Sequence, residues 1–127
     1  MIEQFAFTKH SGLLEAWLKP RGLTMISEEQ LPAFGLVIPT AAMAFVYMQD
    51  GGLALIDRLV TNPMSSPGEK ETASVHVFEG LIAHARLNGA KQIIAFSQRP
   101  STSSWLSLAG LTKHGSDGAF FYLAAGE

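Results

Sequence analysis

Apolar and polar positions recur with two different periods along the first third of the chain. Residues 2–7 alternate loosely between apolar and polar and include Phe5 and Phe7, which predicts a short first strand. From Ser11, which is suited to cap a helix, apolar residues recur at helical spacing through residue 18. We therefore expect the first helix to begin at Ser11.

The middle of the chain predicts a second strand and a β-hairpin. Residues 35–38 form an apolar run that is closed by Pro39. Two further apolar runs, at 42–48 and 53–60, flank Gln49-Asp50-Gly51-Gly52, and such residues tolerate the positive φ of tight turns. This pattern predicts an antiparallel hairpin.

The second half of the chain predicts a long helix between two strands. A Pro/Ser/Gly loop over 62–68 precedes a helical pattern over 69–88, and 92–96 is a continuous apolar run of strand length. Such a run is typical of a strand that is buried on both faces, as parallel sheets require. The remaining predicted elements are a helix over 102–108, a turn over 115–118 and a strand over 119–124.

Composition narrows the class of protein. The 127 residues are 47% hydrophobic and 16% charged, which predicts one folded domain over 1–127. The net charge is −2 and the nine Lys and Arg residues are scattered, so we expect no nucleic-acid partner. Cysteine is absent, which excludes disulfides and thiolate chemistry. No apolar stretch reaches the ~20 residues of a membrane span, so we expect no membrane partner and a cytoplasmic protein.

Three segments carry a resemblance to a known family. Ile56-Asp57-Arg58-Leu59-Val60-Thr61-Asn62-Pro63 resembles the fourth strand of the acyl-CoA-dependent N-acetyltransferases, the GNAT superfamily. The helix and strand over 69–96 are similar to that family's third helix and fifth strand, and 105–111 resembles its last helix. The resemblance implies an α/β fold with a mixed, mostly antiparallel central sheet of about six or seven strands, flanked by helices on both faces.

The resemblance also implies a reaction and a binding mode. An acetyl group would pass from acetyl-CoA to a primary amine by direct attack, with the cosubstrate lying in a splay between the fourth and fifth strands. Main-chain groups of Leu59 and Val60 would pair with the pantetheine and hold the oxyanion. The predicted pyrophosphate-binding residues are Ser66, Gly68, Lys70 and Thr72. A helix N-terminus after a glycine suits phosphate on physical grounds as well, although an ordinary helix entry would use the same residues.

Asp57 is the predicted general base. A carboxylate that is part-buried at the centre of a sheet becomes basic enough to take a proton from an amine, directly or through water. If the strand instead turns Asp57 to solvent, it would serve as a partner for Arg58 or another surface cation. No metal site is expected, because His76 and His84, which share a helix, lie two turns apart, beyond the usual pairing of ligands.

Two departures from the family pattern support an alternative. The loop Ser65-Ser66-Pro67-Gly68-Glu69-Lys70 keeps one glycine of the usual two, and Leu106 stands where the family commonly has a tyrosine acid. The alternative is a catalytically inactive GNAT-fold module that binds CoA or a protein partner. The sequence does not identify the amine acceptor, and an exposed edge on the last strand would support a homodimer.

Overall fold

The computed structural model describes residues 1–97, 99–114 and 120–124. In chain order its elements are β1 (Glu3–Gln4), α1 (Phe7–Leu18), the 3-10 turns η1 (Lys19–Arg21) and η2 (Glu28–Gln30), β2 (Phe34–Ile38), β3 (Ala42–Gln49), β4 (Leu53–Thr61), α2 (Pro67–Leu87), β5 (Gln92–Phe96), α3 (Pro100–Leu108), β6 (Thr112–His114) and β7 (Phe120–Ala124). The predicted turn over 115–118 lies outside the described residues.

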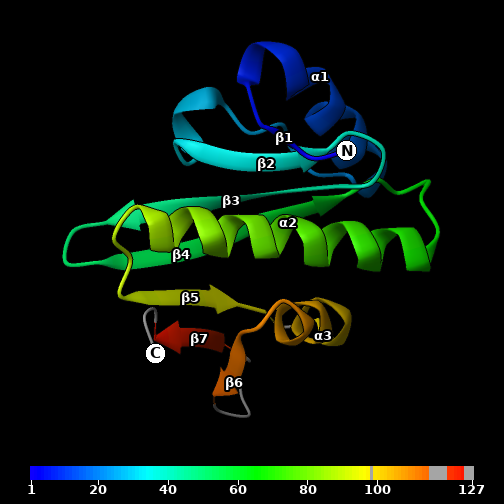
Figure 1. Cartoon of the computed structure of the whole chain (residues 1–127). Coiled ribbons are helices and arrows are strands. Elements are labelled where there is room, and N and C mark those ends of the chain that lie inside the picture. The colour runs from blue at the N-terminus through cyan, green and yellow to red at the C-terminus, as the bar shows by residue number, and fades with distance from the viewer. Residues whose placement is uncertain (98, 115–119, 125–127) are drawn as a thin grey trace.

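The strands form one mixed sheet in the order β1-β2-β3-β4-β5-β7-β6 (Figure 1). β4 and β5 pair in parallel, and every other neighbouring pair among the described strands is antiparallel. The long helix α2 connects β4 to β5 as a crossover, which parallel neighbours require. The predicted hairpin and the mostly antiparallel sheet are confirmed.

Helices α1, α2 and α3 begin earlier than the sequence pattern predicts, and α3 begins at Pro100 instead of residue 102. α1 begins at Phe7 and not at Ser11, because the Ala6 N–H donates to Nδ1 of buried His10 at 2.9 Å. This contact starts the helix one turn upstream and leaves β1 only two residues long. α2 begins at Pro67, since Ser66 caps it and proline is well suited to the first helical position.

The last strand lies between β5 and β6, and β6 pairs with residues 120–122 of it. β6, a three-residue strand that the sequence pattern did not reveal, pairs with β7, for example Lys113 with Phe121. β5 pairs with the other side of β7. The expectation that the last strand offers an exposed edge is therefore wrong, because such a short strand leaves too few residues for a detectable alternation.

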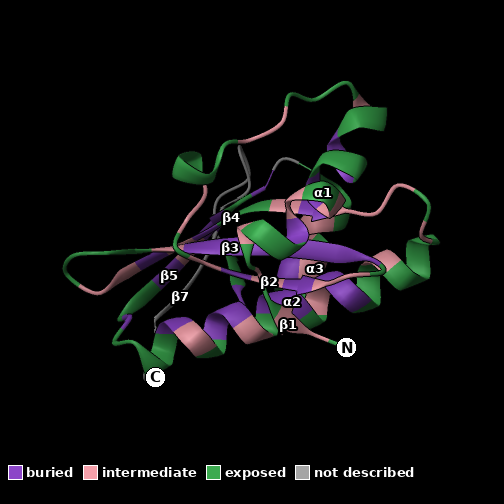
Figure 2. Ribbon diagram, turned by 90° about the horizontal axis from the view of Figure 1, so that it is seen from above, coloured by how far each residue is buried: buried purple, intermediate pink, exposed green. Residues whose placement is uncertain are grey.

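The two faces of the sheet carry separate cores, with α1 and α2 on opposite sides (Figure 2). On the face covered by α2, which we call the α2 face, Val77, Phe78 and Leu81 pack against Ile56 and Ile93. α3 adds its buried Leu106 to the same core. On the opposite face, the α1 face, the core consists mainly of Leu14, Trp17, Leu18, Val37, Met43, Phe45 and Val60.

The α1 face is only partly covered. Side chains alternate along β5, so Ile94 and Phe96 point away from the α2 face, and Phe96 is 64% exposed. By the same alternation Tyr47, Leu55 and Asp57 point to the α1 face, where each is exposed or half-buried. We call these five residues the open part of the α1 face.

His84 of α2 lies outside the two cores and stacks on Phe34 of β2. The ring centroids are 3.5 Å apart and the rings are nearly parallel. Burial lowers the pKa of His84 below its ordinary value.

Candidate functional site

A β-bulge interrupts β4 at the predicted site. Met43 pairs with Val60 and Phe45 with Asp57, so β4 has one more residue than β3 between these pairs. Arg58 lies in this bulge with φ of +60°, and it is the single non-glycine residue with positive φ in the part of the chain that the structure describes. A bulge re-aims the side chains beyond it, and Leu59 accordingly packs on the α2 face.

The strands β4 and β5 diverge next to this bulge. Their parallel pairing runs from Leu53 with Gln92 to Ile56 with Ala95 and then stops. β4 continues to Thr61, whereas β5 ends at Phe96. A cavity of about 440 Å³ opens between them. Its lining residues are Leu18, Arg21, Leu23, Asp57, Arg58, Leu59, Val60, Thr61, Lys70, Phe96, Ser97, Arg99, Ser101, Thr102 and Trp105.

The cavity is strongly cationic although the whole chain is acidic. Four cations line it, namely Arg21, Arg58, Lys70 and Arg99, against the single carboxylate of Asp57. Within the described residues none of these four cations forms an ion pair, since the ion pairs there join Glu3 to Lys9 and His10. The linear pattern of charges does not reveal this cluster, because its members come from four separate segments that only the fold brings together. The site therefore suits an anionic ligand.

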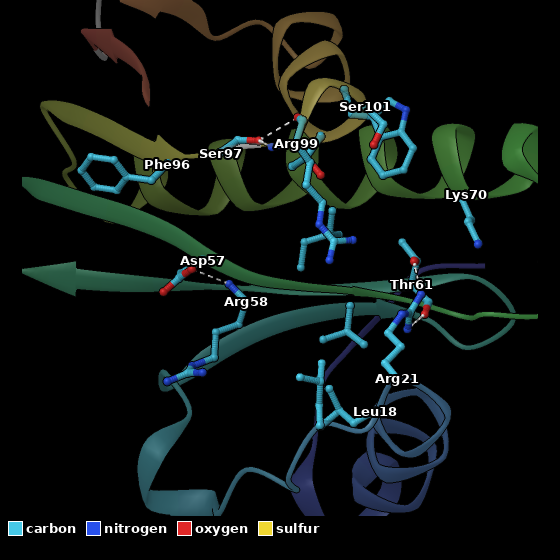
Figure 3. A pocket seen from close by; sticks show the side chains of 15 residues that line it. Leu18, Arg21, Asp57, Arg58, Thr61, Lys70, Phe96, Ser97, Arg99 and Ser101 are labelled. Carbon is cyan, nitrogen blue, oxygen red and sulfur yellow. Dashed lines mark hydrogen bonds between the residues drawn. The ribbon is translucent and has the colours of Figure 1, made fainter. Parts of the chain in front are cut away.

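The charges are distributed along the cavity (Figure 3). Asp57 and Arg58 lie at one end of the view, Lys70 lies at the other, and Arg99 lies in the gap between the two strands. Lys70 comes from the first turn of α2 and Ser101 from the first turn of α3. The two ends of the cavity thus present different sets of charged groups.

Arg21 joins the end of α1 to the end of β4. One terminal nitrogen of its guanidinium donates to the carbonyl oxygens of Trp17 at 3.0 Å and Thr61 at 2.6 Å. The other terminal nitrogen donates to Oγ1 of Thr61 at 3.0 Å. Desolvation by burial, together with the neighbouring charge of Arg99, lowers the pKa of Arg21. Sequence reasoning missed this residue, which follows a helix and precedes a glycine like an ordinary surface arginine.

Asp57 is exposed and not part-buried. The alternation along β4 turns it toward the open part of the α1 face, and its Oδ1 accepts a hydrogen bond from the Arg58 N–H at 2.8 Å. The Arg58 side chain does not pair with Asp57; its Nε donates to the Tyr47 hydroxyl at 3.5 Å. The burial on which its predicted basicity rested is absent, although the carboxylate does lie in the cavity beside the splay.

The predicted pyrophosphate residues lie on two sides of the α2 N-terminus. Ser66 Oγ accepts from the Glu69 N–H at 3.2 Å, and the Glu69 carboxylate accepts from the Ser66 N–H at 2.8 Å. Hydrogen bonding of the carboxylate to Ser66, first of all to its main-chain N–H, holds the pKa of Glu69 below its ordinary value. Lys70 lines the cavity of the splay, whereas Gly68 and Thr72 line a second cavity of about 520 Å³.

The capping box leaves little of the helix terminus for an anion. Pro67 has no N–H, the Glu69 N–H is bound by Ser66 Oγ, and the Lys70 N–H donates to the Ser66 carbonyl at 2.9 Å. Gly68 is therefore the first-turn residue whose N–H has no acceptor among the described residues. Glu69 adds a negative charge on the side of the second cavity.

α3 contributes polar groups and an aromatic wall. Ser97 is buried, and its Oγ donates to the Arg99 carbonyl at 3.1 Å and accepts from Ser103 Oγ at 3.2 Å. Trp105 lines the cavity. Leu106, at the position of the family's tyrosine, is 1% exposed and packs in the α2-face core.

Comparison with solved structures identifies the fold. The chain superposes on the aminoglycoside 6'-N-acetyltransferase from Enterococcus faecium with a TM-score of 0.69 and 14% identity, covering 98% of this chain and 97% of that one. It superposes on the protein yncA from Salmonella typhimurium, solved with its cofactor acetyl-CoA, with a TM-score of 0.72 and 13% identity, covering 100% and 94%.

A longer enzyme shares the same domain. The chain superposes on N-acetylglutamate synthase from Neisseria gonorrhoeae, solved with coenzyme A and N-acetyl-glutamate, with a TM-score of 0.69 and 16% identity. It is covered completely in this match and spans only 36% of the synthase chain. No family model matches the chain, and no curated protein matches it.

The fold is that of the GNAT acetyltransferases, as the resemblance of the fourth strand implied. No helix in the described ranges has the length and apolar character needed to cross a bilayer. The same residues contain no group of three or more His, Cys, Asp or Glu side chains arranged to hold a metal ion.

Proposed function

We propose that this protein is an N-acetyltransferase that transfers the acetyl group of acetyl-CoA to a primary amine. The observation that carries the proposal is the divergence of β4 and β5 at the Arg58 bulge, which opens a cationic cavity beside unpaired strand backbone. The thioester would lie at the bulge, with the pantetheine along Leu59 and Val60, whose main-chain groups no longer pair with β5. The structures of similar fold that contain CoA or acetyl-CoA support this assignment.

Side chains supply most of the charge that the phosphates of the donor need. Lys70 and Arg99 lie along the part of the cavity that leads to α2, and Ser101 adds a hydroxyl. The Gly68 N–H is available at the same helix terminus. Ser66 and Thr72 stay predicted contacts.

The reaction needs one base and no covalent intermediate. The acceptor ammonium loses a proton toward Asp57 or water, and its nitrogen attacks the thioester carbonyl. The C–S bond breaks, the amide forms, and the thiolate takes up a proton, so that ammonium and acetyl-CoA yield amide, CoA and one proton. The developing oxyanion is held by a main-chain N–H near Val60.

Calorimetric titration of acetyl-CoA into the protein, with ATP and CoA as controls, tests donor binding. Saturable binding that favours the acyl-CoA supports the proposal, and the absence of binding at millimolar ligand contradicts it. Asp57→Asn tests the base: it should keep donor binding and lower kcat by about 100-fold or more. An Asp57→Asn enzyme with full activity would exclude Asp57 from proton transfer.

The capping box favours a second candidate, a non-catalytic module of the same fold, because it occupies helix amides that a phosphate would use. Gly68→Asp separates the two. A Cβ at Gly68 meets nothing within 4 Å, so the ligand-free variant should be as stable as the wild type. Acetyl-CoA at 100 times its Kd stabilises a binding protein by about 2.7 kcal/mol. Loss of this stabilisation in Gly68→Asp supports the donor site, whereas its absence in the wild type supports the module.

A further inference from the structure

The end of the cavity that lies away from the N-terminus of α2 has its own charged groups, and their assignment to an acceptor rests on the proposed function. Asp57 lies on the open part of the α1 face and Arg58 beside it, while Lys70 comes from the helix on the α2 face. A donor that approaches past Lys70 therefore leaves Asp57 and Arg58 for the acceptor. Phe96, 64% exposed, adds apolar surface at the same end.

Arg58 occupies a backbone conformation that is unfavourable for a residue with a side chain. A non-glycine residue at φ of +60° costs on the order of 1 kcal/mol, and glycine would adopt it without strain. Strain of this kind persists most often where a side chain serves a ligand. The bulge alone would be satisfied by glycine, so the arginine itself requires an explanation.

The charges of Asp57 and Arg58 are adjacent but do not neutralise each other. Asp57 Oδ1 is bound to the main-chain N–H of Arg58, and the guanidinium makes only a long bond to the Tyr47 hydroxyl. Side by side, a carboxylate and a guanidinium match an ammonium and a carboxylate carried on the same carbon atom. We infer that the acceptor is an amino acid, whose ammonium group faces Asp57 and whose carboxylate is bound by Arg58.

The surrounding charge argues against polycationic acceptors. The phosphates of the donor neutralise Lys70 and Arg99, and the guanidinium of Arg58 remains at the acceptor end as a positive charge that a polyamine or an aminoglycoside would have to overcome. A zwitterion gains from the same field, because its carboxylate meets a guanidinium in a two-pronged geometry that lysine does not reproduce. The acceptor class is thus inferred from the cavity, whatever acceptors other proteins of this fold use.

The test compares matched acceptors. Each standard amino acid except cysteine and proline is offered with acetyl-CoA beside its amide and its decarboxylated amine, together with spermidine and kanamycin. Released CoA is followed with a thiol-reactive chromophore, and the protein contributes no background because it has no cysteine. We expect kcat/KM for at least one amino acid to exceed that of its amide by about 10- to 100-fold, as expected for a bond to a charged group. A preference for the amide, the amine or the polycations overturns the inference.

Variants of Arg58 give the second test. Arg58→Gly keeps the bulge conformation and removes the guanidinium, so it should raise KM for the amino acid by about 10- to 100-fold with little change in kcat. Arg58→Lys should recover part of the loss, and Arg58→Glu should reverse the preference toward cationic amines. Arg86→Gln, which removes an exposed arginine on α2, is the matched control and should leave KM unchanged. A normal KM in Arg58→Gly overturns the role of Arg58.

The outcomes separate this inference from the proposed function. Acetylation of amines with no preference for a carboxylate overturns the inference and leaves the acetyltransferase in place. Binding of acetyl-CoA without turnover of any amino acid also overturns the inference. Failure to bind acetyl-CoA overturns the proposed function itself. A melting temperature of Arg58→Gly within about 3 °C of the wild type shows that a KM effect does not come from unfolding.

Discussion

Removing the donors of Arg21 should loosen the cavity at its α1 side. The guanidinium makes three hydrogen bonds to Trp17 and Thr61, and Arg21→Met deletes them while keeping the apolar stem. At about 1 kcal/mol per bond the loss is roughly 3 kcal/mol. Release of a partly desolvated charge, which the lowered pKa of Arg21 reflects, returns part of this. We therefore expect a net loss of about 2 kcal/mol.

The corresponding thermal shift is measurable. An unfolding entropy of about 2.1 cal/mol/K per residue gives roughly 270 cal/mol/K for 127 residues, so 2 kcal/mol lowers Tm by about 7 °C. Urea unfolding followed by tryptophan fluorescence gives the free energy of unfolding, and calorimetry gives Tm. Arg21→Lys keeps the positive charge but not the forked guanidinium, so its Tm should lie between those of the wild type and Arg21→Met.

Thr61→Val is the matched partner variant. It removes the bond to Oγ1 but keeps the 2.6 Å bond to the Thr61 carbonyl, so we expect a loss of about 1 kcal/mol or less. In the double variant the two losses should not add, because they share one contact. An Arg21→Met protein within about 0.5 kcal/mol of the wild type would refute the view that Arg21 holds β4 against α1.

Three further outcomes are expected from local geometry. Gly35→Ala would bring a Cβ to 2.3 Å from the Phe45 ring. Urea unfolding should therefore show that the free energy of unfolding falls by about 1–3 kcal/mol. An unchanged urea midpoint would mean that the ring moves aside freely. Ser66→Ala removes the α2 cap and should cost about 1 kcal/mol in the same assay, against near-neutral Ser104→Ala on the surface of α3. The pKa of His84 is lowered by burial, so the folded state binds fewer protons than the unfolded state and stability should decrease as the pH falls below about 6.5. His84→Gln should lose this dependence in melting curves at pH 7.5 and 5.5, whereas a wild type that is relatively more stable at pH 5.5 would show that the charged ring is favoured.

The order of elements was set by local patterns that the sequence displays. The turn residues at 49–52 and the apolar runs on either side determined the hairpin of β3 and β4, and the continuous run at 92–96 determined β5. These patterns are readable because alternation and helical spacing act over a few neighbouring residues. The predicted starts of the helices were less accurate, because α1 begins early through a hydrogen bond from the Ala6 N–H to the side chain of His10.

The location of the splay was also accessible from the sequence, through the resemblance of the segment around Asp57. The β-bulge in β4 could not be predicted from the sequence. The bulge residue is Arg58, and a strand pattern gives no sign that an arginine has a positive φ. The exposure of Asp57 resulted from the limited reach of α1, which the alternation along β4 does not specify.

The sequence by itself determined the fold class, the position of the strand gap and the residues that surround it in the chain. Only the tertiary structure decided the sign of the cavity's charge, because Arg21, Arg58, Lys70 and Arg99 are isolated in sequence and converge through sheet pairing and helix packing. It also decided that Gly68 and Thr72 face a different cavity from Lys70, since a helix turns successive residues to different sides. Electrostatic potential depends on distances in space, and those distances exist only once the chain has folded.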